Sequence, residues 1–437
     1  TNADGAIVDI EKNWWGSDDE PTVNDHTLTN YGQWCTDNTC ASFNSDIKLD
    51  LASNGVGNDN FYGDTQFDRA LSESTGSDTY TFFNDKTYAS KDINQAVTLT
   101  ANNNATFGTA LTISAAATLD DVNITGDTTI TAAATIKDSD ITKTLSIQST
   151  GVNIGTAGNG NRFVLANDDT GITSGGAGTY AAVSIVDNSF EATADDDYIG
   201  MDLGTHFTGG TMTITNNSMT EKINYGIKIA GDSVATLIKN SIISAGLTKG
   251  TGAGEAHSAI YLSGNAAHVI GTSGTIGNAN TLQGFAAGLH ITNAVVATNL
   301  VVKYNKISSN TNAATNADGA IVDIEKNWWG SDAEPTVNDH TLTNYGNWCI
   351  DNTCATFNYD IINNTQTKYY GKSQFARALS EAATDNTVTF DNHTSAMTQV
   401  QAGLNNITIN GSDNTTFDQP FTVNDQIIID DFIFTNT

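Results

Sequence analysis

Residues 1–47 read TNADGAIVDIEKNWWGSDDEPTVNDHTLTNYGQWCTDNTCASFNSDI, and residues 315–361 repeat them as TNADGAIVDIEKNWWGSDAEPTVNDHTLTNYGNWCIDNTCATFNYDI. Only five of the 47 positions differ. A weaker match follows each copy, because YGDTQFDRALSE at 62–73 returns as YGKSQFARALSE at 370–381. Self-similarity at a long period is typical of repeat proteins. We therefore expect a complete unit at residues 49–360, between the end of a preceding unit (residues 1–48) and the start of a following one (residues 361–437). The alternative is a single protein whose two ends are duplicated.

A shorter period lies inside the unit. Ile113, Ile130 and Ile147 are 17 residues apart, and so are Leu119 and Ile136. The segments around them are short alternating runs of β-type residues separated by small or polar turn residues. Helical spacing does not fit, so the period predicts stacked β-coils in which each isoleucine lies directly above the preceding one.

Further along the chain, an apolar-x-x-Asn-x-apolar motif recurs. Its asparagines are Asn188, Asn217, Asn240, Asn305 and Asn327, and a further coil around Asn280 falls in the longest gap. Asparagine tolerates the left-handed conformation of a sharp bend. Its amide can also bond to the asparagine of the coil above and below, as in stacked cross-β ladders. We expect a structural ladder; the alternative is a set of asparagines that bind a ligand.

These features resemble the right-handed parallel β-helix, or pectin-lyase-like, repeat family of prokaryotic surface, adhesin and filament proteins. The residues that carry the resemblance are the asparagine coils, KNWWG at 12–16 and 326–330, and the QFxRALSE segments with TVTF at 387–390. The resemblance implies an all-β solenoid, with a short capping helix at its first coil and an Asn-x-Trp-Trp-Gly coil at its end. The fold hosts lyases, hydrolases, tailspikes and adhesins, so it does not identify an activity.

Bare strand edges at the two ends of a coil stack need covers. We expect Thr65 and Ser373 to be the N-caps of short helices whose apolar faces, beginning at Phe67 and Phe375, cover the first coil. Large apolar covers for the last coil are expected from the tryptophans Trp14, Trp15 and Trp34 and their counterparts Trp328, Trp329 and Trp348.

The four cysteines form two C-x4-C pairs, Cys35/Cys40 and Cys349/Cys354. A metal site would need two such pairs close together, and these belong to copies 314 residues apart. We expect a local disulfide in each pair, which indicates an oxidising, extracellular location at the cell surface.

The formal charge is −31, with 49 acidic and 18 basic side chains. Such a balance argues against a nucleic-acid partner, which needs clustered Lys and Arg. The sequence has no apolar stretch near 18 residues, so this segment is not expected to span a membrane. No cofactor is expected, although the acidic turn Asp195, Asp196 and Asp197 is a candidate calcium site; the alternative is a solvated loop.

Catalytic residues are not evident. Arg69 and Arg377 are interpreted as surface charges of the capping helices, which leaves Arg162 as the one basic candidate for a lyase. The sequence contains no H-E-x-x-H or GxGxxG motif. We expect a non-enzymatic extracellular protein that self-associates head to tail into a filament, sheath or adhesin stalk, with surface glycans as further candidate partners. The alternative is a carbohydrate-binding or polysaccharide-cleaving β-helix that presents exposed aromatics such as Tyr180, Tyr198 and Tyr225.

Overall fold

The computed structural model divides into two compact units, Thr1–Lys222 and Ile223–Thr437, and each is described by itself. The described residues are 7–26, 28–51, 59–166, 169–192, 198–244, 257–264, 266–271, 274, 276–292, 300–317, 320–340, 343–364, 368–382, 387–390, 394–395, 407–417 and 427–434.

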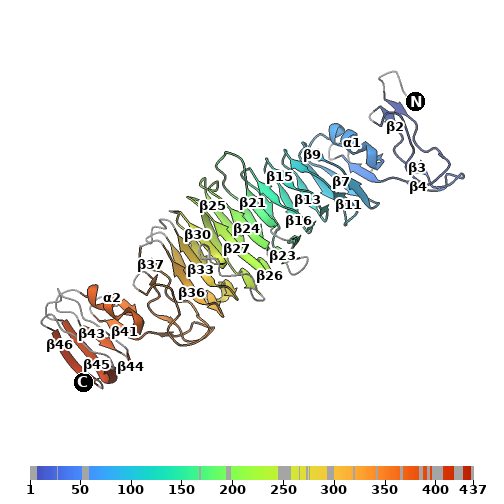
Figure 1. Ribbon diagram of the computed structural model, residues 1–437. Helices are drawn as coiled ribbons and strands as arrows, with labels where there is room; N and C mark the ends of the chain where they lie inside the picture. Colours follow the sequence, from blue (N-terminus) through green and yellow to red (C-terminus); the bar gives the residue numbers. More distant parts are fainter. Residues whose placement is uncertain are drawn as a thin grey trace. The chain divides into compact units, whose positions relative to one another are not determined.

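In the first compact unit the chain winds through successive coils, and most coils add one short strand to each of three parallel sheets (Figure 1). Sheet one contains β7 (Asp78–Phe82), β10 (Val97–Thr100), β13 (Thr118–Asp120), β16 (Thr135–Lys137), β19 (Asn153–Ile154), β22 (Ser184–Val186) and β25 (Thr211–Thr215). Sheet two contains β8 (Lys86–Tyr88), β11 (Ala105–Phe107), β14 (Asn123–Ile124), β17 (Asp140–Ile141), β20 (Arg162–Leu165), β23 (Ser189–Ala192) and β26 (Ser218–Glu221). Sheet three contains β9 (Lys91–Ile93), β12 (Leu111–Ile113), β15 (Thr128–Ile130), β18 (Leu145–Ile147), β21 (Thr170–Ser174) and β24 (Tyr198–Leu203).

The register of these strands confirms the stacking predicted from the 17-residue period. Ile113 is paired with Ile130 and Ile130 with Ile147, all three fully buried, and Leu119 is paired with Ile136. Inward side chains alternate with outward Thr and Asp, since successive residues of a strand point to opposite faces. The core is therefore a column of stacked aliphatic side chains.

The second compact unit is also built of coils with three parallel sheets. Sheet one strands are β28 (Val234–Ile238), β31 (Val269–Gly271) and β34 (Val301–Lys303); sheet two strands are β29 (Ser241–Ser244), β32 (Thr281–Gln283) and β35 (Lys306–Ser308). Sheet three strands are β27 (Ile223–Ile229), β30 (Ser258–Ser263), β33 (Ala287–Thr292) and β36 (Asn312–Asn316), and a 3-10 turn, η2, spans Ile276–Asn278. The fold is an all-β parallel β-helix solenoid with short helices, as the sequence predicted.

Two cap segments, residues 7–46 and 320–360, have matching strands. In the first, β1 (Val8–Asp9) pairs with β2 (Thr29–Asn30), and β3 (Trp34–Cys35) with β4 (Phe43–Asn44). The second repeats these pairs with β37 (Val322–Asp323), β38 (Thr343–Asn344), β39 (Trp348–Cys349) and β40 (Phe357–Asn358).

A hairpin and a helix follow each cap segment. The first hairpin joins β5 (Ile47–Asp50) to β6 (Asp59–Tyr62), and β5 also runs antiparallel to β7. Turn η1 (Asp64–Gln66) then leads into α1 (Phe67–Glu73). The second set comprises β41 (Ile361–Asn363), β42 (Lys368–Tyr370), η4 (Lys372–Gln374), α2 (Phe375–Ser380), β43 (Thr387–Phe390), β44 (Thr394–Ser395), β45 (Ile407–Phe417) and β46 (Ile427–Phe434).

The helices cover the coil as predicted, but their details differ. Phe67, Ala70 and Leu71 are buried, and the Phe67 ring lies 5.0 Å from that of Tyr88 in the first coil. The prediction that Thr65 and Ser373 are N-caps was wrong. A 3-10 turn precedes each α-helix, and the N-cap of this turn is Gly63 in the first copy and Gly371 in the second.

The interpretation of Arg69 and Arg377 as surface charges was also wrong. Both are buried, and their Nε atoms bond to Glu73 (2.7 Å) and Glu381 (2.6 Å) one helical turn later. The Arg69 guanidinium also lies over the ring of Tyr62, and the Arg377 guanidinium over the ring of Tyr370. No helix in the described parts of the chain is long and apolar enough to cross a membrane.

Candidate functional site: a junction built twice

The contact between each cap segment and the helix that follows it is formed by the same bonds in both copies. Gln66 donates from Nε2 to the Thr29 carbonyl oxygen at 2.7 Å, and its Oε1 accepts from the Gly63 N–H at 3.1 Å. One side chain thus satisfies a cap strand and the start of the helix together. The second junction has the equivalent bonds from Gln374 to Thr343 (2.6 Å) and Gly371 (3.1 Å).

A half-buried glutamate lies across the same junction. Glu20 Oε1 accepts from the Thr65 hydroxyl at 2.7 Å and from the Tyr31 hydroxyl. The second copy repeats this arrangement, with Glu334 accepting from the Ser373 hydroxyl (2.9 Å) and the Tyr345 hydroxyl (2.5 Å). In both copies the glutamate holds a tyrosine of the cap and a hydroxyl of the 3-10 turn.

The glutamate needs a glycine beside it. A Cβ at Gly63 would lie 1.8 Å from Glu20 Oε1, and one at Gly371 would lie 2.0 Å from Glu334 Oε1. Both distances are far inside van der Waals contact, so the absence of a side chain permits the approach. Here the glycine serves close packing of the cap, since neither position has a positive φ.

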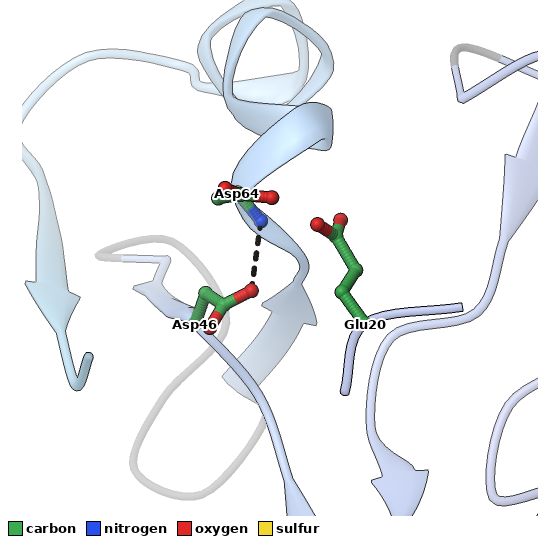
Figure 2. A group of neighbouring side chains, drawn as sticks. All are labelled: Glu20, Asp46 and Asp64. Carbon is green, nitrogen blue, oxygen red and sulfur yellow. Dashed lines mark hydrogen bonds between the residues drawn. The ribbon is translucent and has the colours of Figure 1, made fainter. Parts of the chain in front are cut away.

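The two junctions differ in charge. The first brings together Glu20 from the cap, Asp46 before β5 and Asp64 in η1, with ligand oxygens within 4.8 Å of one another (Figure 2). The Asp64 N–H donates to Asp46 at 3.1 Å. Burial, with a hydrogen bond to Asp64, raises the pKa of Glu20 to about 7. At the position of Asp64 the second copy has Lys372, whose N–H donates to Asp360 at 2.7 Å.

The predicted asparagines form ladders within each compact unit. In the first, Asn188 Nδ2 donates to Asn217 Oδ1 at 2.9 Å and to the Ile154 carbonyl at 2.8 Å. In the second, Asn305 Nδ2 donates to Asn327 Oδ1 at 2.9 Å. Asn240 belongs to this second ladder, through a 2.9 Å bond to Asn280. The asparagine amides therefore bond to one another and to backbone carbonyls, which is the arrangement of a structural ladder.

Two features of the ladder differ from expectation. The left-handed conformation falls on the residue before the asparagine, for example at Asp187, Asn216 and Lys239, with φ of 61°, 58° and 59°. Asn161 also belongs to the ladder, since it donates to Asn188 at 2.9 Å. The motif search missed Asn161 because Gly158 occupies the first apolar position; its Asn-x-Phe half was the available signal.

The tryptophans of the two cap segments have different surroundings. Trp34 and Trp348 are both buried. Trp329 is 8% exposed on the last coil, where the neighbouring Trp328 N–H donates to the Asn305 carbonyl at 2.8 Å. Trp14 and Trp15, the counterparts in the first copy, are 38% and 40% exposed. Thus Trp15 does not cover a coil in this structure as Trp329 does.

Of the remaining predicted sites, the cysteine pairs form disulfides and the candidate calcium turn lies outside the described residues. Disulfides join Cys35 to Cys40 and Cys349 to Cys354. The candidate calcium turn, Asp195, Asp196 and Asp197, lies outside the described residues.

The residues predicted for carbohydrate chemistry are either ion-paired or buried. Arg162 pairs with Glu191 through two contacts of 3.1 Å. Tyr180, Tyr198 and Tyr225 are buried, so the expectation that they are exposed aromatics was wrong. Tyr180 donates to the Gly175 carbonyl, and Tyr198 to Phe190 and Thr220 carbonyls. A comparison with family models, curated proteins and solved structures found no match.

Proposed function

We propose that this chain is an extracellular structural protein in which parallel β-helix units are joined end to end into a cell-surface filament, sheath or adhesin stalk. The observation that carries the proposal is the junction built twice. A cap segment binds the helix that follows it, at the start of the next coils, through Gln66 in one copy and Gln374 in the other. A repeated connector of this kind is what a linear array requires, because each unit contacts only its neighbours.

Three further properties support an extracellular structural role. Each coil is tied to the next by parallel strand pairing, an aliphatic column and, in the later coils, an asparagine ladder. The local disulfides suit an oxidising compartment. The resemblance to the pectin-lyase-like repeat family of surface proteins points in the same direction.

The carbohydrate-cleaving alternative has less support. The tyrosines expected to stack on sugars are buried, and Arg162 is held by Glu191. Pairing with Glu191 also raises the pKa of Arg162, which makes it a poorer proton acceptor.

The test is to locate and image the native protein. Antibodies raised against the chain should label filaments or a sheath outside intact source cells in immunogold electron microscopy, and purified native material should contain linear arrays. Labelling confined to the cell interior, or native material made only of isolated compact particles, would overturn the proposal. Incubation with polysaccharides is the second arm, and release of reducing or unsaturated sugars would show that the role is not only structural.

A further inference from the structure

The first junction contains a cluster of oxygens that the second junction lacks. Glu20, Asp46 and Asp64 come from three separate segments, and Figure 2 shows the Glu20 carboxylate directed toward Asp64. Asp46 is 2% exposed, and its oxygens accept from the Asp64 N–H and from Asn84 Nδ2 at 2.8 Å. Carboxylates are gathered in this way where a hard cation, or a proton, compensates their charge.

A second observation points to an occupant. The Tyr88 side chain is 4% exposed, and its hydroxyl has no hydrogen-bond partner in the structure. This hydroxyl interacts electrostatically with Asp46, Asp64 and Glu20, so it lies near the cluster. Buried polar atoms are normally bonded, so the Tyr88 hydroxyl has the capacity to bond to a further group.

The charges around the cluster do not cancel. Lys86 is the cation that faces it, with Nζ 3.7 Å from oxygens of both Asp46 and Asp64. Three carboxylates therefore face one ammonium group. Further polar side chains complete the surroundings. The hydroxyls of Tyr31 and Thr65 bond to Glu20, and His26 Nδ1 lies 2.6 Å from Thr65 Oγ1.

The second copy shows how the same junction is built without the cluster. At the positions of Asp64, Lys86 and Tyr88 it has Lys372, Thr394 and Ala396. The third carboxylate and the tyrosine hydroxyl are thus replaced together, and the lysine is moved onto the 3-10 turn. Glu334 and Asp360 remain, so the second junction has two carboxylates for one lysine where the first has three.

We propose that the first junction binds a hard divalent cation, best matched by Ca2+, through carboxylate oxygens of Glu20, Asp46 and Asp64. Calcium takes oxygen ligands at about 2.3–2.6 Å, so two oxygens on one ion lie at most about 5 Å apart. The separation of up to 4.8 Å keeps each pair of these oxygens within this limit. Tyr88 offers a hydroxyl to the ion or to a water bound to it. The ion would tie the cap, the hairpin and the helix together.

Hydrogen exchange of the full chain, measured with and without Ca2+, tests the site. The second junction of the same chain is the control. At a free Ca2+ concentration tenfold above its dissociation constant, peptides covering residues 16–31 and 59–73 should exchange about tenfold more slowly. Peptides covering 330–340 and 368–381, in the second junction, should be unchanged. Asp64→Lys, which copies the second junction and is therefore expected to fold, should remove the effect; Asp64→Asn should weaken it, while Asp121→Asn should leave it intact.

Equal Ca2+ effects in the two junctions, or an effect that survives Asp64→Lys, would overturn the site. The outcome in which exchange depends on pH but not on Ca2+ would also overturn it, since a proton would then occupy the cluster. This proposal goes beyond the filament role. Because cation binding is measured on the isolated chain and the filament role on native cells, each can fail without the other.

Discussion

Gln66 Nε2 lies 2.7 Å from the carbonyl oxygen of Thr29, and 308 residues further on Gln374 makes the same type of bond to Thr343. Replacing Gln66 by alanine leaves that carbonyl and the Gly63 N–H without their buried partner. We expect the first junction to lose about 2–3 kcal/mol. Hydrogen exchange of residues 59–73 should accelerate accordingly, while Gln95→Ala, outside the junction, should have little effect. Unchanged exchange in Gln66→Ala would contradict the assigned role.

The asparagine ladder gives a second prediction. Asn280 is fully buried; it donates to the Leu237 carbonyl and to Asn305 Oδ1, and it accepts from Asn240. Asn280→Ala should destabilise its coil by roughly 3–5 kcal/mol, measured by denaturant unfolding of the full chain. Asn280→Ser should cost less, because Ser139 already serves as the acceptor at this position of an earlier coil. Equal losses of stability for the two variants would indicate that Asn280 stabilises its coil by packing and not by its ladder hydrogen bonds.

The pH dependence of stability should depend in part on His268. It is fully buried, neither ring nitrogen has a hydrogen-bond partner, and burial lowers its pKa to about 4. The unfolded chain takes up this proton near pH 6.5, so the unfolded state binds more protons between pH 6.5 and 4. Its contribution is therefore constant above pH 6.5 and falls as pH drops, by about 3 kcal/mol at pH 4.

Unfolding in urea at pH 7 and pH 4.5 measures this effect. His268→Leu should lose less stability than the native chain between the two pH values. His206, which is only half-buried, provides the control when replaced by Asn, and this variant should behave like the native chain. If His268→Leu and the native chain lose the same amount, the imidazole does not carry the effect.

Close packing at Gly63 yields a fourth prediction. Gly63→Ala places a Cβ where Glu20 Oε1 lies, so the first junction should be destabilised by about 1–3 kcal/mol. Truncating the glutamate as well, in Gly63→Ala/Glu20→Ala, should recover the steric part of that loss. Gly277→Ala meets no atom within 4 Å and should be tolerated. A double variant whose loss equals the sum of the two single losses would exclude the proposed clash.

The coil stack could be predicted because its periodicity is local. Ile113, Ile130 and Ile147 follow from a fixed spacing, and the ladder asparagines lie between apolar residues. The junction could not be predicted in the same way. Glu20 and Thr65 are 45 residues apart, and nothing in either segment indicates the bond between them.

Exposure was the least predictable property. Trp15 and Trp329 stand in nearly identical sequence, yet Trp15 is 40% exposed and Trp329 is 8% exposed. Arg69 was misinterpreted because a single charge on an amphipathic helix is usually solvated, whereas here Arg69 is buried, pairs with Glu73 and lies over the ring of Tyr62. The left-handed residue was misplaced by one position, because propensity alone assigns it to asparagine.

The hydrogen bonds between ladder asparagines all have the same length, although the number of residues between successive asparagines varies. Segments of 27, 29, 40, 25 and 22 residues all end in an amide bond of 2.9 Å. The stacking therefore does not depend on how much chain leaves the coil between two rungs. The turns between rungs are therefore where a lineage could add or remove residues without disturbing the core, and where foreign peptides could be inserted for display.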